Sequence, residues 1–370
     1  MTIVTGRDIL DFFFKSTLSV MITEMPFFFN AKNRGSKMKN LFKKFILSTS
    51  LLGLLALPAF AAECPRGDLD KRYCDVNGDL VADTPTDPSK LVDPSTLIFA
   101  YTPVEDPAVY KGVWADFLVH MESVTGKKVV FFPVQSNAAQ IEAMRSGRLH
   151  IAGFNTGSNP LAVNCAGFES FTIMASLTGH FGYEMEIITY PGSGINKVED
   201  IRGKTLAFTS PTSNSGKKAP SAILKSKFDM IADRDFEPVY SGKHDNSILG
   251  VANKDYVAAS IANSVKSRMI KRGVIKEGDV ITIYKSQTFP TTGFGYAHNL
   301  NPALKAKIQA AFFSFQWDKP DWAQKKMVPT SLKEEFSKSK EGQFIPISYK
   351  THWAVIRTID KANGVSYACK

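Results

Sequence analysis

Short apolar runs alternate with segments of helical spacing along most of this 370-residue chain, and this alternation limits the possible folds more than any other feature. Apolar runs at 97–103, 128–134 and 149–154 are separated by helical segments that end at Gly126 and Gly147. Strands that alternate with helices of this length are typical of parallel sheets covered by helices. The sequence therefore predicts an α/β fold.

A second series of the same kind begins with the run TLAF at 205–208 and continues to the run ITIYKSQ at 281–287. Two extended segments join the two series, so the chain is expected to pass twice between two lobes, each a mainly parallel sheet flanked by helices. The first lobe is predicted to comprise residues 96–187 and 286–370, and the second lobe residues 188–285.

The region before these series carries an export signal. Three lysines precede an apolar stretch that is too short to span a bilayer, and Ala59-Phe60-Ala61 matches a small-x-small cleavage site. We interpret residues 38–61 as a signal peptide, so the mature protein is expected in the periplasm. Residues 1–37 are interpreted as a non-native segment upstream of the natural start and are left out of the fold prediction.

The charge of the mature chain is modest. The full chain has 45 Lys and Arg against 35 Asp and Glu, a net charge of +10; residues 1–61 hold eight of the basic and three of the acidic residues, which leaves +5. A surplus of this size is too small to indicate nucleic-acid binding, and it suits a protein that binds small anions.

All four cysteines lie in the exported part, where an oxidising compartment allows disulfides. Cys64 and Cys74 are the local candidates for one bridge, which leaves Cys165 and Cys369 to tie the C-terminus to the first lobe. Four cysteines allow three pairings, so the connectivity stays open at this point. The sequence contains no C-x-x-C motif, which argues against a redox role.

Residues 62–95 form a polar segment rich in Asp and Pro, which predicts an irregular extension. Within it, four oxygen-bearing side chains have the spacing D-x-N-x-D-x-x-x-D, which favours a calcium site; no other cofactor is expected. The glycine that usually follows the third acid is replaced by Leu80, so a solvated acidic loop beside Cys74 is the alternative. The candidate calcium ligands are Asp75, Asn77, Asp79 and Asp83.

One stretch, SPTSNSGKKAP at 210–220, collects hydroxyl and amide side chains between an apolar run and a predicted helix. The N-terminus of a helix offers free N–H groups and a positive dipole end, and Gly216 lets the backbone approach a ligand closely. These features predict a seat for an anion, built from neutral donors. The alternative is an ordinary helix cap, because Ser, Thr and Asn are also the preferred N-cap residues.

The next predicted strand ends at Ser241-Gly242, and His244 lies at the start of the helix after it. Ligands of open α/β sheets bind at the carboxyl ends of the strands, so two successive turns are expected to meet there. His244 is therefore expected close to the hydroxyl-rich stretch, where its ring can donate a hydrogen bond to an oxyanion.

Three motifs taken together resemble one family. Ser210–Gly216 is similar to the pattern D-P-x-S-T-S-G, Lys243–Asn253 to G-H-[DE]-x-x-[AS]-[IL]-x-A-V-A-N, and Ile141–Phe154 to I-E-A-M-R-x-G-x-V-D-I-A-W. These patterns belong to the periplasmic substrate-binding proteins of phosphonate, phosphite and phosphate ABC transporters. The resemblance runs from about Leu97 to about Phe315.

This resemblance implies a two-lobed type II periplasmic binding protein fold, whose lobes close around the ligand by a hinge motion. It implies a monomeric receptor, not an enzyme, that delivers a phosphonate, phosphite or phosphate to an ABC permease. The hinge segments are expected at Glu184–Tyr190 and Ile283–Gln287. The residues implied to hold the phosphonyl oxygens are Ser213, Asn214, Ser215 and His244.

The chain departs from the family pattern at positions that help to read the organic part of the ligand. A tyrosine-bearing motif, D-Y-A-G, is replaced by Ser136-Asn137-Ala138-Ala139, and an expected Asn or Asp is replaced by Ala262. These changes favour a small or uncharged substituent, or an inorganic oxyanion, over an aminoalkyl phosphonate. The first-lobe residues expected at the ligand are Tyr101, Asn137, Asn155 and Thr156, and Phe154 is a candidate for either lining or packing.

Two other classes of protein stay open from the residues alone. Ser213 or Ser215 with His244 would serve a secreted serine hydrolase or acyl-transfer enzyme, and only Asp245 is an obvious residue to orient the histidine. The sequence contains no H-E-x-x-H or G-x-S-x-G motif that supports an enzyme. The acidic extension would also suit a sensory or adhesion module.

Overall fold

The computed structural model describes residues 64–176, 178–315 and 342–369. The predicted signal peptide at 38–61 and the upstream segment at 1–37 lie outside the described residues. In the described part of the chain, no helix combines the length and the apolar character that crossing a membrane requires.

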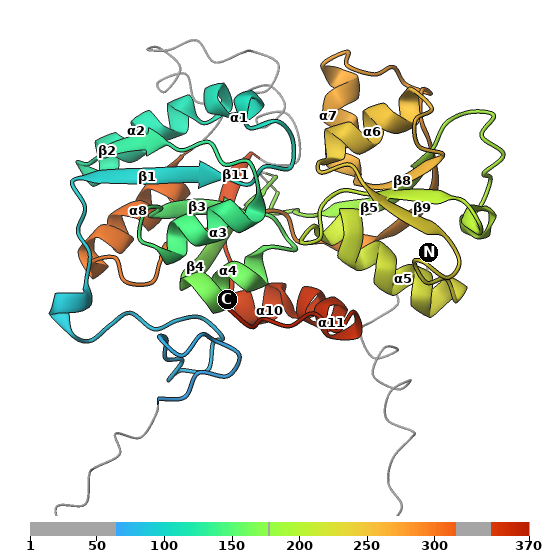
Figure 1. The fold of residues 1–370 in the computed structure, drawn as a ribbon. Helices are drawn as coiled ribbons and strands as arrows, with labels where there is room; N and C mark the ends of the chain where they lie inside the picture. The colour runs from blue at the N-terminus through green and yellow to red at the C-terminus, as the bar shows by residue number, and fades with distance from the viewer. Residues whose placement is uncertain (1–63, 177, 316–341, 370) are drawn as a thin grey trace, which may run out of the picture. The chain divides into compact units, whose positions relative to one another are not determined.

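The first predicted series folds into a six-stranded sheet (Figure 1). Its strands are β1 (Thr96–Tyr101), β2 (Lys128–Phe131), β3 (Ile151–Phe154), β4 (Phe168–Ala175), β10 (Gly293–Ala297) and β11 (Gln343–Pro346). They lie in the order β11-β4-β10-β3-β1-β2, in which β1 is parallel to both neighbours and the other pairs are antiparallel. The accompanying helices are α1 (Pro107–Val113), α2 (Ala115–Thr125), α3 (Asn137–Arg145), α4 (Asn159–Ala166) and α8 (Pro302–Ser314).

Local signals in the sequence set the ends of these helices. The side chain of Asp106 accepts the Ala108 N–H at the start of α1, and the side chain of Ser136 accepts the Ala139 N–H at the start of α3. α2 ends at Gly126, whose φ of +71° lies in the left-handed region that glycine adopts without strain. Between these signals, buried aromatic rings of the helices and strands pack against one another: Phe99, Trp114, Phe117, Phe294, Phe312 and Phe344.

The second predicted series folds into a five-stranded sheet with the strands β5 (Tyr183–Thr189), β6 (Thr205–Phe208), β7 (Glu237–Tyr240), β8 (Ala258–Ala262) and β9 (Ile281–Phe289). Their order is β7-β6-β8-β5-β9, in which β6 is parallel to β7 and β8, and β5 is antiparallel to β8 and β9. The helical elements are η2 (Val198–Ile201), the π-helical turn η3 (Asn214–Lys218), α5 (Ala219–Phe228), α6 (His244–Ala252) and α7 (Asn263–Lys271).

These two sheets with their helices confirm the predicted two-lobed α/β fold, and both sheets are mixed. β5 and β10 run against their neighbours because each follows an extended connection instead of a crossover helix. The chain leaves the first sheet after β4 and returns to it through Pro290–Thr292. The predicted lobe boundaries and hinge segments fall within β5 and β9, except that the first hinge segment ends one residue after β5, and these two strands pair in the second sheet. An apolar run does not reveal with which sheet it pairs.

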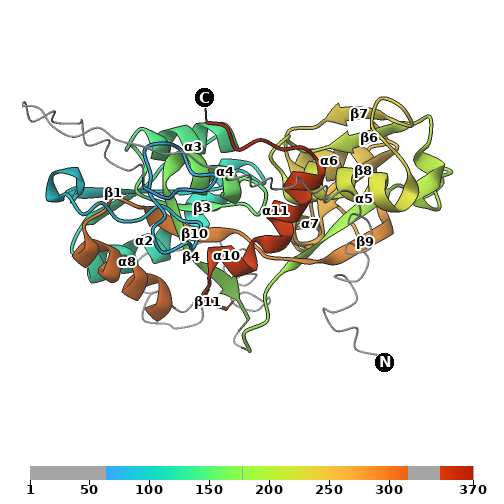
Figure 2. The ribbon, with the colours of Figure 1, turned by 90° about the horizontal axis from the view of Figure 1, so that it is seen from below.

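The C-terminal helices provide a further link between the lobes. α10 (Tyr349–His352) and α11 (Ala354–Ala362) follow β11 of the first sheet, yet α11 contacts η3 and α5 of the second lobe (Figure 2). The C-terminal segment therefore reaches the hydroxyl-rich stretch that the sequence singles out.

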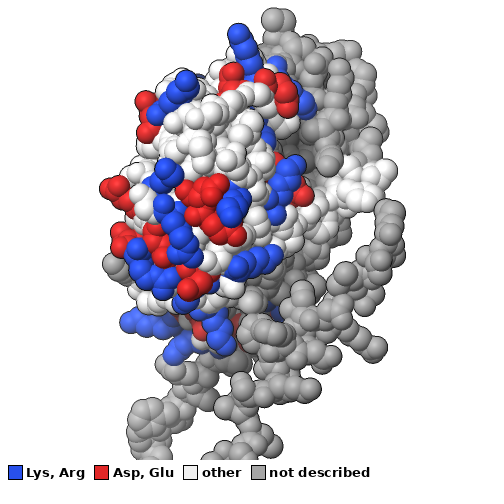
Figure 3. Space-filling view, turned by 90° about the vertical axis from the view of Figure 1, so that its right-hand side faces the viewer, with Lys and Arg blue, Asp and Glu red and all other residues white. Residues whose placement is uncertain are grey.

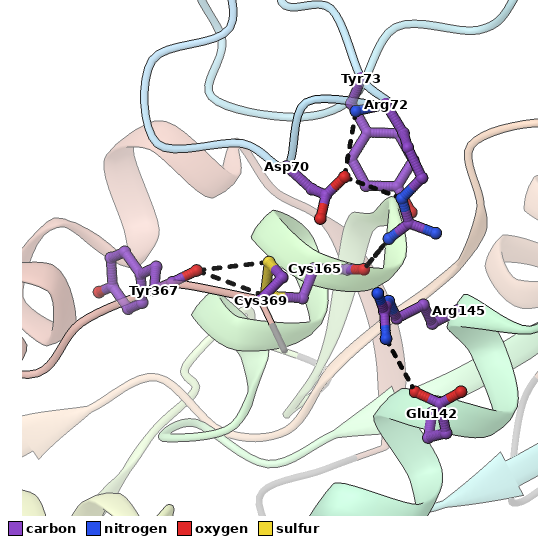
Figure 4. A network of polar contacts seen from close by, with 8 residues as sticks. All are labelled: Asp70, Arg72, Tyr73, Glu142, Arg145, Cys165, Tyr367 and Cys369. Carbon is purple, nitrogen blue, oxygen red and sulfur yellow. Dashed lines mark hydrogen bonds and ion pairs between the residues drawn. A yellow bond between two sulfur atoms is a disulfide. The ribbon is translucent and has the colours of Figure 1, made fainter.

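Polar contacts tie the extension to the first lobe, whereas the disulfides close a loop within the extension and join the C-terminus to α4. Both candidate disulfides, Cys64–Cys74 and Cys165–Cys369, are present. The Arg72 guanidinium donates to the backbone carbonyl of Cys165 at 2.8 Å, and it also pairs with Asp70 at 2.8 Å (Figure 4). Apart from the short turn η1 (Pro88–Lys90) and one isolated bridge, the extension is irregular, as its composition predicts.

Candidate functional site

A cavity of about 60 Å³ lies among turns of both lobes and the segments that join them. One water molecule needs roughly 10–15 Å³ on this measure, so the cavity suits a ligand the size of about five waters. Every residue expected at the ligand borders it except Asn137, while Phe154 packs against Phe168 in the core. The lining residues are Tyr101, Val104, Asn155, Thr156, Tyr183, Ser213, Asn214, Ser215, His244, Ala262, Ser264, Val265, Arg268, Thr291 and Thr292.

The hydroxyl-rich stretch Ser210–Lys218, here called the anion loop, forms one wall of this cavity. Ser213 is the N-cap of η3, and its Oγ accepts the Gly216 N–H at 3.0 Å. Because η3 continues directly into α5, the first N–H groups of this helix and its positive dipole end lie at the cavity. A Cβ at Gly216 would lie 1.9 Å from Thr209 Oγ1, so this tight turn requires glycine.

His244 is buried at the start of α6 and adds a further donor. Its Nδ1 accepts the backbone N–H of Ala262 at 3.1 Å, so the proton of the neutral ring resides on Nε2. Burial, reinforced by the nearby positive charge of Arg268, lowers the pKa of His244 to about 4. The ring is therefore a neutral donor at physiological pH, and its Nε2 lies 3.3 Å from Ser213 Oγ.

The same geometry argues against the alternative of a serine hydrolase. A general base needs an unprotonated nitrogen that faces the serine, but His244 directs its Nε2–H toward Ser213. The carboxylate of Asp245 accepts the backbone N–H groups of Asp106 and Asn246, and His244 Nδ1 is occupied by Ala262. In the described residues, no carboxylate is placed to orient this histidine as a base.

The first-lobe side chains that were expected at the ligand mostly form hydrogen bonds with one another and with the joining segments. Asn155 Nδ2 donates to Thr102 and Asn137, and its Oδ1 accepts the N–H groups of Gly157 and Ser158. Asn137 does not line the cavity itself and donates to Thr212 Oγ1 of the second lobe at 2.7 Å. Thr156 Oγ1 donates to the Pro290 carbonyl in the joining segment at 2.7 Å. These side chains hold the shape of the site and connect the lobes.

Several lining residues have little or no signal in the sequence. Ser264, Val265 and Arg268 lie on one face of α7, which starts where β8 ends at the same sheet edge as His244. Thr291 comes from the joining segment, and its buried hydroxyl has no hydrogen-bond partner in the described part of the chain. The start of α7 at the end of β8 is a feature of the chain that could have predicted Arg268 at the cavity. No feature of the sequence predicts Thr291 there.

The candidate calcium ligands lie together in one loop of the extension. Asp75 accepts the N–H groups of Asp79 and Leu80, and Asp83 accepts that of Val76 at 2.7 Å. Leu80 occupies the position of the usual glycine and adopts a φ of +68°. Among the described residues, no group of three or more His, Cys, Asp or Glu is arranged to hold a metal.

Calcium binding by this loop stays a prediction with a direct test. Calorimetric titration of the mature protein with calcium, with magnesium as the control ion, measures heat of binding together with any rise in melting temperature. A saturable heat that is lost in Asp75→Asn supports the site; no heat and an unchanged melting temperature remove it.

Charges of opposite sign intermingle on the face of the molecule that Figure 3 shows. On the second lobe, Asp235 pairs with both Arg202 and Arg234. This mixture agrees with the modest net charge of the mature chain.

Comparison with known proteins places the chain in a family. A family model described as the phosphonate ABC transporter periplasmic substrate-binding protein matches residues 99–337. Because this match covers more than half of the chain, the chain belongs to that family. The family consists of transport proteins that bind a substrate, which agrees with the cavity between the two lobes.

Individual relatives agree with this assignment. The Phosphate-import protein PhnD of Mycolicibacterium smegmatis is 27% identical over 287 residues, which are 75% of this chain and 85% of the relative. The binding protein component of an ABC phosphonate transporter from Pseudomonas aeruginosa has a TM-score of 0.62 at 23% identity, covering 72% of this chain and 86% of its own. PhnD1 from Prochlorococcus marinus, solved with methylphosphonate, has a TM-score of 0.61 at 14% identity, covering 74% and 100%. These two structures share the fold.

Proposed function

We propose that the protein is a periplasmic receptor that encloses a small phosphorus oxyanion, such as phosphate, phosphite or a short alkylphosphonate, and delivers it to an ABC permease. The observation that carries the proposal is the set of neutral donors, from the anion loop and His244 Nε2, at a cavity of about 60 Å³. Membership of a transport family supports the partnership with a permease. The predicted signal peptide and the two disulfides support the periplasmic location.

The remaining lining residues favour a small, uncharged substituent on the oxyanion. They include Val104, Ala262, Val265 and the ring of Tyr101, and no Asp or Glu borders the cavity within the described residues. An aminoalkyl group would lose its hydration there without gaining a counter-charge, which is costly. A hydrogen, hydroxyl or methyl substituent fits both the size and the polarity of this wall.

His244→Ala is expected to weaken binding of the preferred oxyanion about 10- to 100-fold, because a hydrogen bond to a charged group is worth about 1.5–3 kcal/mol. Isothermal calorimetry on the mature protein with phosphate, phosphite, methylphosphonate and 2-aminoethylphosphonate measures this effect and ranks the ligands. We expect 2-aminoethylphosphonate to bind at least tenfold more weakly than the best ligand. Asn246→Ala, on the exposed face of the same helix, is the matched control.

Failure of all four ligands to bind or to raise the melting temperature of the wild-type protein would contradict the proposal. An activated ester separates it from the hydrolase alternative: a burst of product that disappears in Ser215→Ala would indicate an enzyme, and we expect none.

A further inference from the structure

Two residues that border the cavity each carry a buried side-chain atom without a hydrogen-bond partner in the described part of the chain. The atoms are the amide oxygen Oδ1 of Asn214 and the hydroxyl Oγ1 of Thr291. The two residues are only 1% and 7% exposed. Buried polar atoms are nearly always hydrogen-bonded, because an unsatisfied one loses its hydration without compensation. A single small ligand fills a cavity of about 60 Å³, so we expect this ligand to be the partner of both atoms.

The amide of Asn214 offers the ligand an acceptor. Its Nδ2 donates to the Tyr183 hydroxyl oxygen on β5 at 3.1 Å, which leaves Oδ1 for the ligand. An amide oxygen can only accept a hydrogen bond, and so can an unprotonated oxygen of an oxyanion. The two would repel each other, whereas a hydroxyl on the ligand would donate to Oδ1. This wall of the cavity therefore favours a ligand that brings a proton.

The hydroxyl of Thr291 is held at the cavity by its backbone. Thr156 Oγ1 lies 2.7 Å from the Pro290 carbonyl oxygen and 3.4 Å from that of Thr291, which fixes the segment that joins β9 to β10. A threonine hydroxyl can donate as well as accept, so it can bind a ligand oxygen in either protonation state. Thr291 is therefore expected to contribute to affinity, and Asn214 to selectivity.

We infer that the site selects phosphorus oxyanions that carry a hydroxyl: Asn214 Oδ1 accepts the proton of a P–OH group, and Thr291 Oγ1 binds a further ligand oxygen. Hydrogenphosphate and the monoanions of phosphite and methylphosphonate have such a hydroxyl. Sulfate and the dianions of phosphite and methylphosphonate lack it. The inference rests on the proposed function and adds the protonation state of the ligand to it.

The ionisable groups at the cavity keep one charge state while the ligands titrate. Burial, reinforced by Arg268, lowers the pKa of His244 to about 4, so its ring stays neutral. Arg268 lies 2.7 Å from Glu105. Burial favours the neutral form of this acid, but Arg268 and Arg272 lower the pKa of Glu105 below its usual value, so the carboxylate stays ionised.

Other charged groups lie beside the anion loop and at the start of α6. Lys217 Nζ lies 4.1 Å from the centre of the Phe208 ring, and Lys218 Nζ lies 2.9 Å from Asp360. Burial lowers the pKa of both lysines and raises that of the half-buried Asp245. Titration of any of them would affect every oxyanion alike, so phosphate is the internal control for the protein.

Calorimetry on the mature protein with phosphate, sulfate and methylphosphonate tests the selection. Sulfate is expected to bind at least about tenfold more weakly than phosphate, because it leaves the buried acceptor unpaired. Methylphosphonate affinity is expected to fall about tenfold for each pH unit above its second pKa, since only the monoanion binds. Over the same range hydrogenphosphate keeps its hydroxyl, so phosphate affinity is expected to change less than about threefold.

The heat of binding provides a second readout. Above the second pKa of methylphosphonate, formation of the complex takes up a proton from the buffer. The measured heat is therefore expected to depend on the ionisation enthalpy of the buffer for methylphosphonate, and not for phosphate.

Two variants assign the selection to residues. Asn214→Thr introduces the threonine of the family pattern D-P-x-S-T-S-G, whose hydroxyl can donate to an unprotonated oxygen. This variant is expected to gain affinity for the methylphosphonate dianion and to lose the pH dependence. Thr291→Val removes the hydroxyl at equal size and is expected to weaken phosphate binding about tenfold. Thr288→Val, exposed near the end of β9, is the matched control and is expected to bind as the wild type does.

Each outcome decides a separate point. If phosphate binds and either sulfate or the methylphosphonate dianion binds equally well, the selection is overturned while the proposed function stands. If the wild type binds none of the three anions at any pH, the proposed function fails and the selection fails with it. An unaltered pH dependence in Asn214→Thr, or wild-type affinity in Thr291→Val, removes the role of that residue. Circular dichroism of each variant verifies that it is folded.

Discussion

Replacing Asp360 by Asn is expected to lower the free energy of unfolding by about 3–5 kcal/mol, the range found when one partner of a buried ion pair is removed. Asp360 on α11 lies 2.9 Å from Lys218 Nζ at the end of the anion loop, and their side chains are 1% and 4% exposed. Burial lowers the pKa of Lys218, and Asp360 opposes that effect. Without the carboxylate, the buried ammonium loses its only charged partner in the described residues.

The pair also connects three parts of the chain. Lys218 Nζ donates to the Gly157 carbonyl of the first lobe at 2.7 Å, and the Tyr367 hydroxyl donates to Asp360 at 2.9 Å. Asn363 Nδ2 donates to the Lys218 carbonyl at 2.8 Å. The C-terminal segment, anchored by the Cys165–Cys369 disulfide, therefore holds the anion loop in place.

Urea denaturation of the ligand-free protein measures the loss. Lys361→Ala, exposed on the same helix, is the control and is expected to change stability by less than about 0.5 kcal/mol. The double variant Lys218→Met/Asp360→Leu is expected to recover most of the stability, because apolar groups of similar volume can replace a buried ion pair. An Asp360→Asn variant as stable as the wild type would show that the ammonium is solvated in solution.

Gly157→Ala is expected to weaken oxyanion binding by about 10- to 100-fold. Gly157 lies in the turn after β3, and a Cβ there would stand 2.2 Å from the Thr212 carbonyl oxygen and 2.4 Å from the Asn214 nitrogen. Both atoms are backbone of the anion loop, so no side chain can rotate away and the lobes must separate slightly. Overpacking of this kind costs about 1–3 kcal/mol, which corresponds to the expected loss of affinity.

The readout is the rise in melting temperature that a saturating oxyanion produces, together with the calorimetric Kd. We expect the ligand-free melting temperature to change little, since a methyl group is tolerated where the lobes are apart. Ser158→Ala, at the next position, removes atoms and is the control. Wild-type affinity in Gly157→Ala would show that the bound form does not bring these two turns as close as the structure does.

The parts of the protein that depend on near neighbours are predictable from the sequence. The strand and helix rhythm predicts two α/β lobes, and Ser213 at a strand-to-helix turn predicts the helix cap that faces the cavity. His244 is predictable because successive strands of one sheet end at the same edge. Cys64 and Cys74 are predictable as a candidate local pair, but the sequence leaves three pairings open, and the structure decides for Cys64–Cys74 and Cys165–Cys369.

The amino-acid sequence by itself determined the fold class, the anion loop and its histidine, because caps, turns and periodicity act over a few residues. Only the tertiary structure decided which distant side chains meet. Glu105 and Arg268 are 163 residues apart, and Lys218 and Asp360 are 142 residues apart. The tertiary structure also brought Asn137 and Asn155 into hydrogen bonds that connect parts of the site, and it placed Thr291 at the cavity. Such pairings depend on the order of strands in two sheets and on the approach of the two lobes, and no local pattern in the chain encodes either.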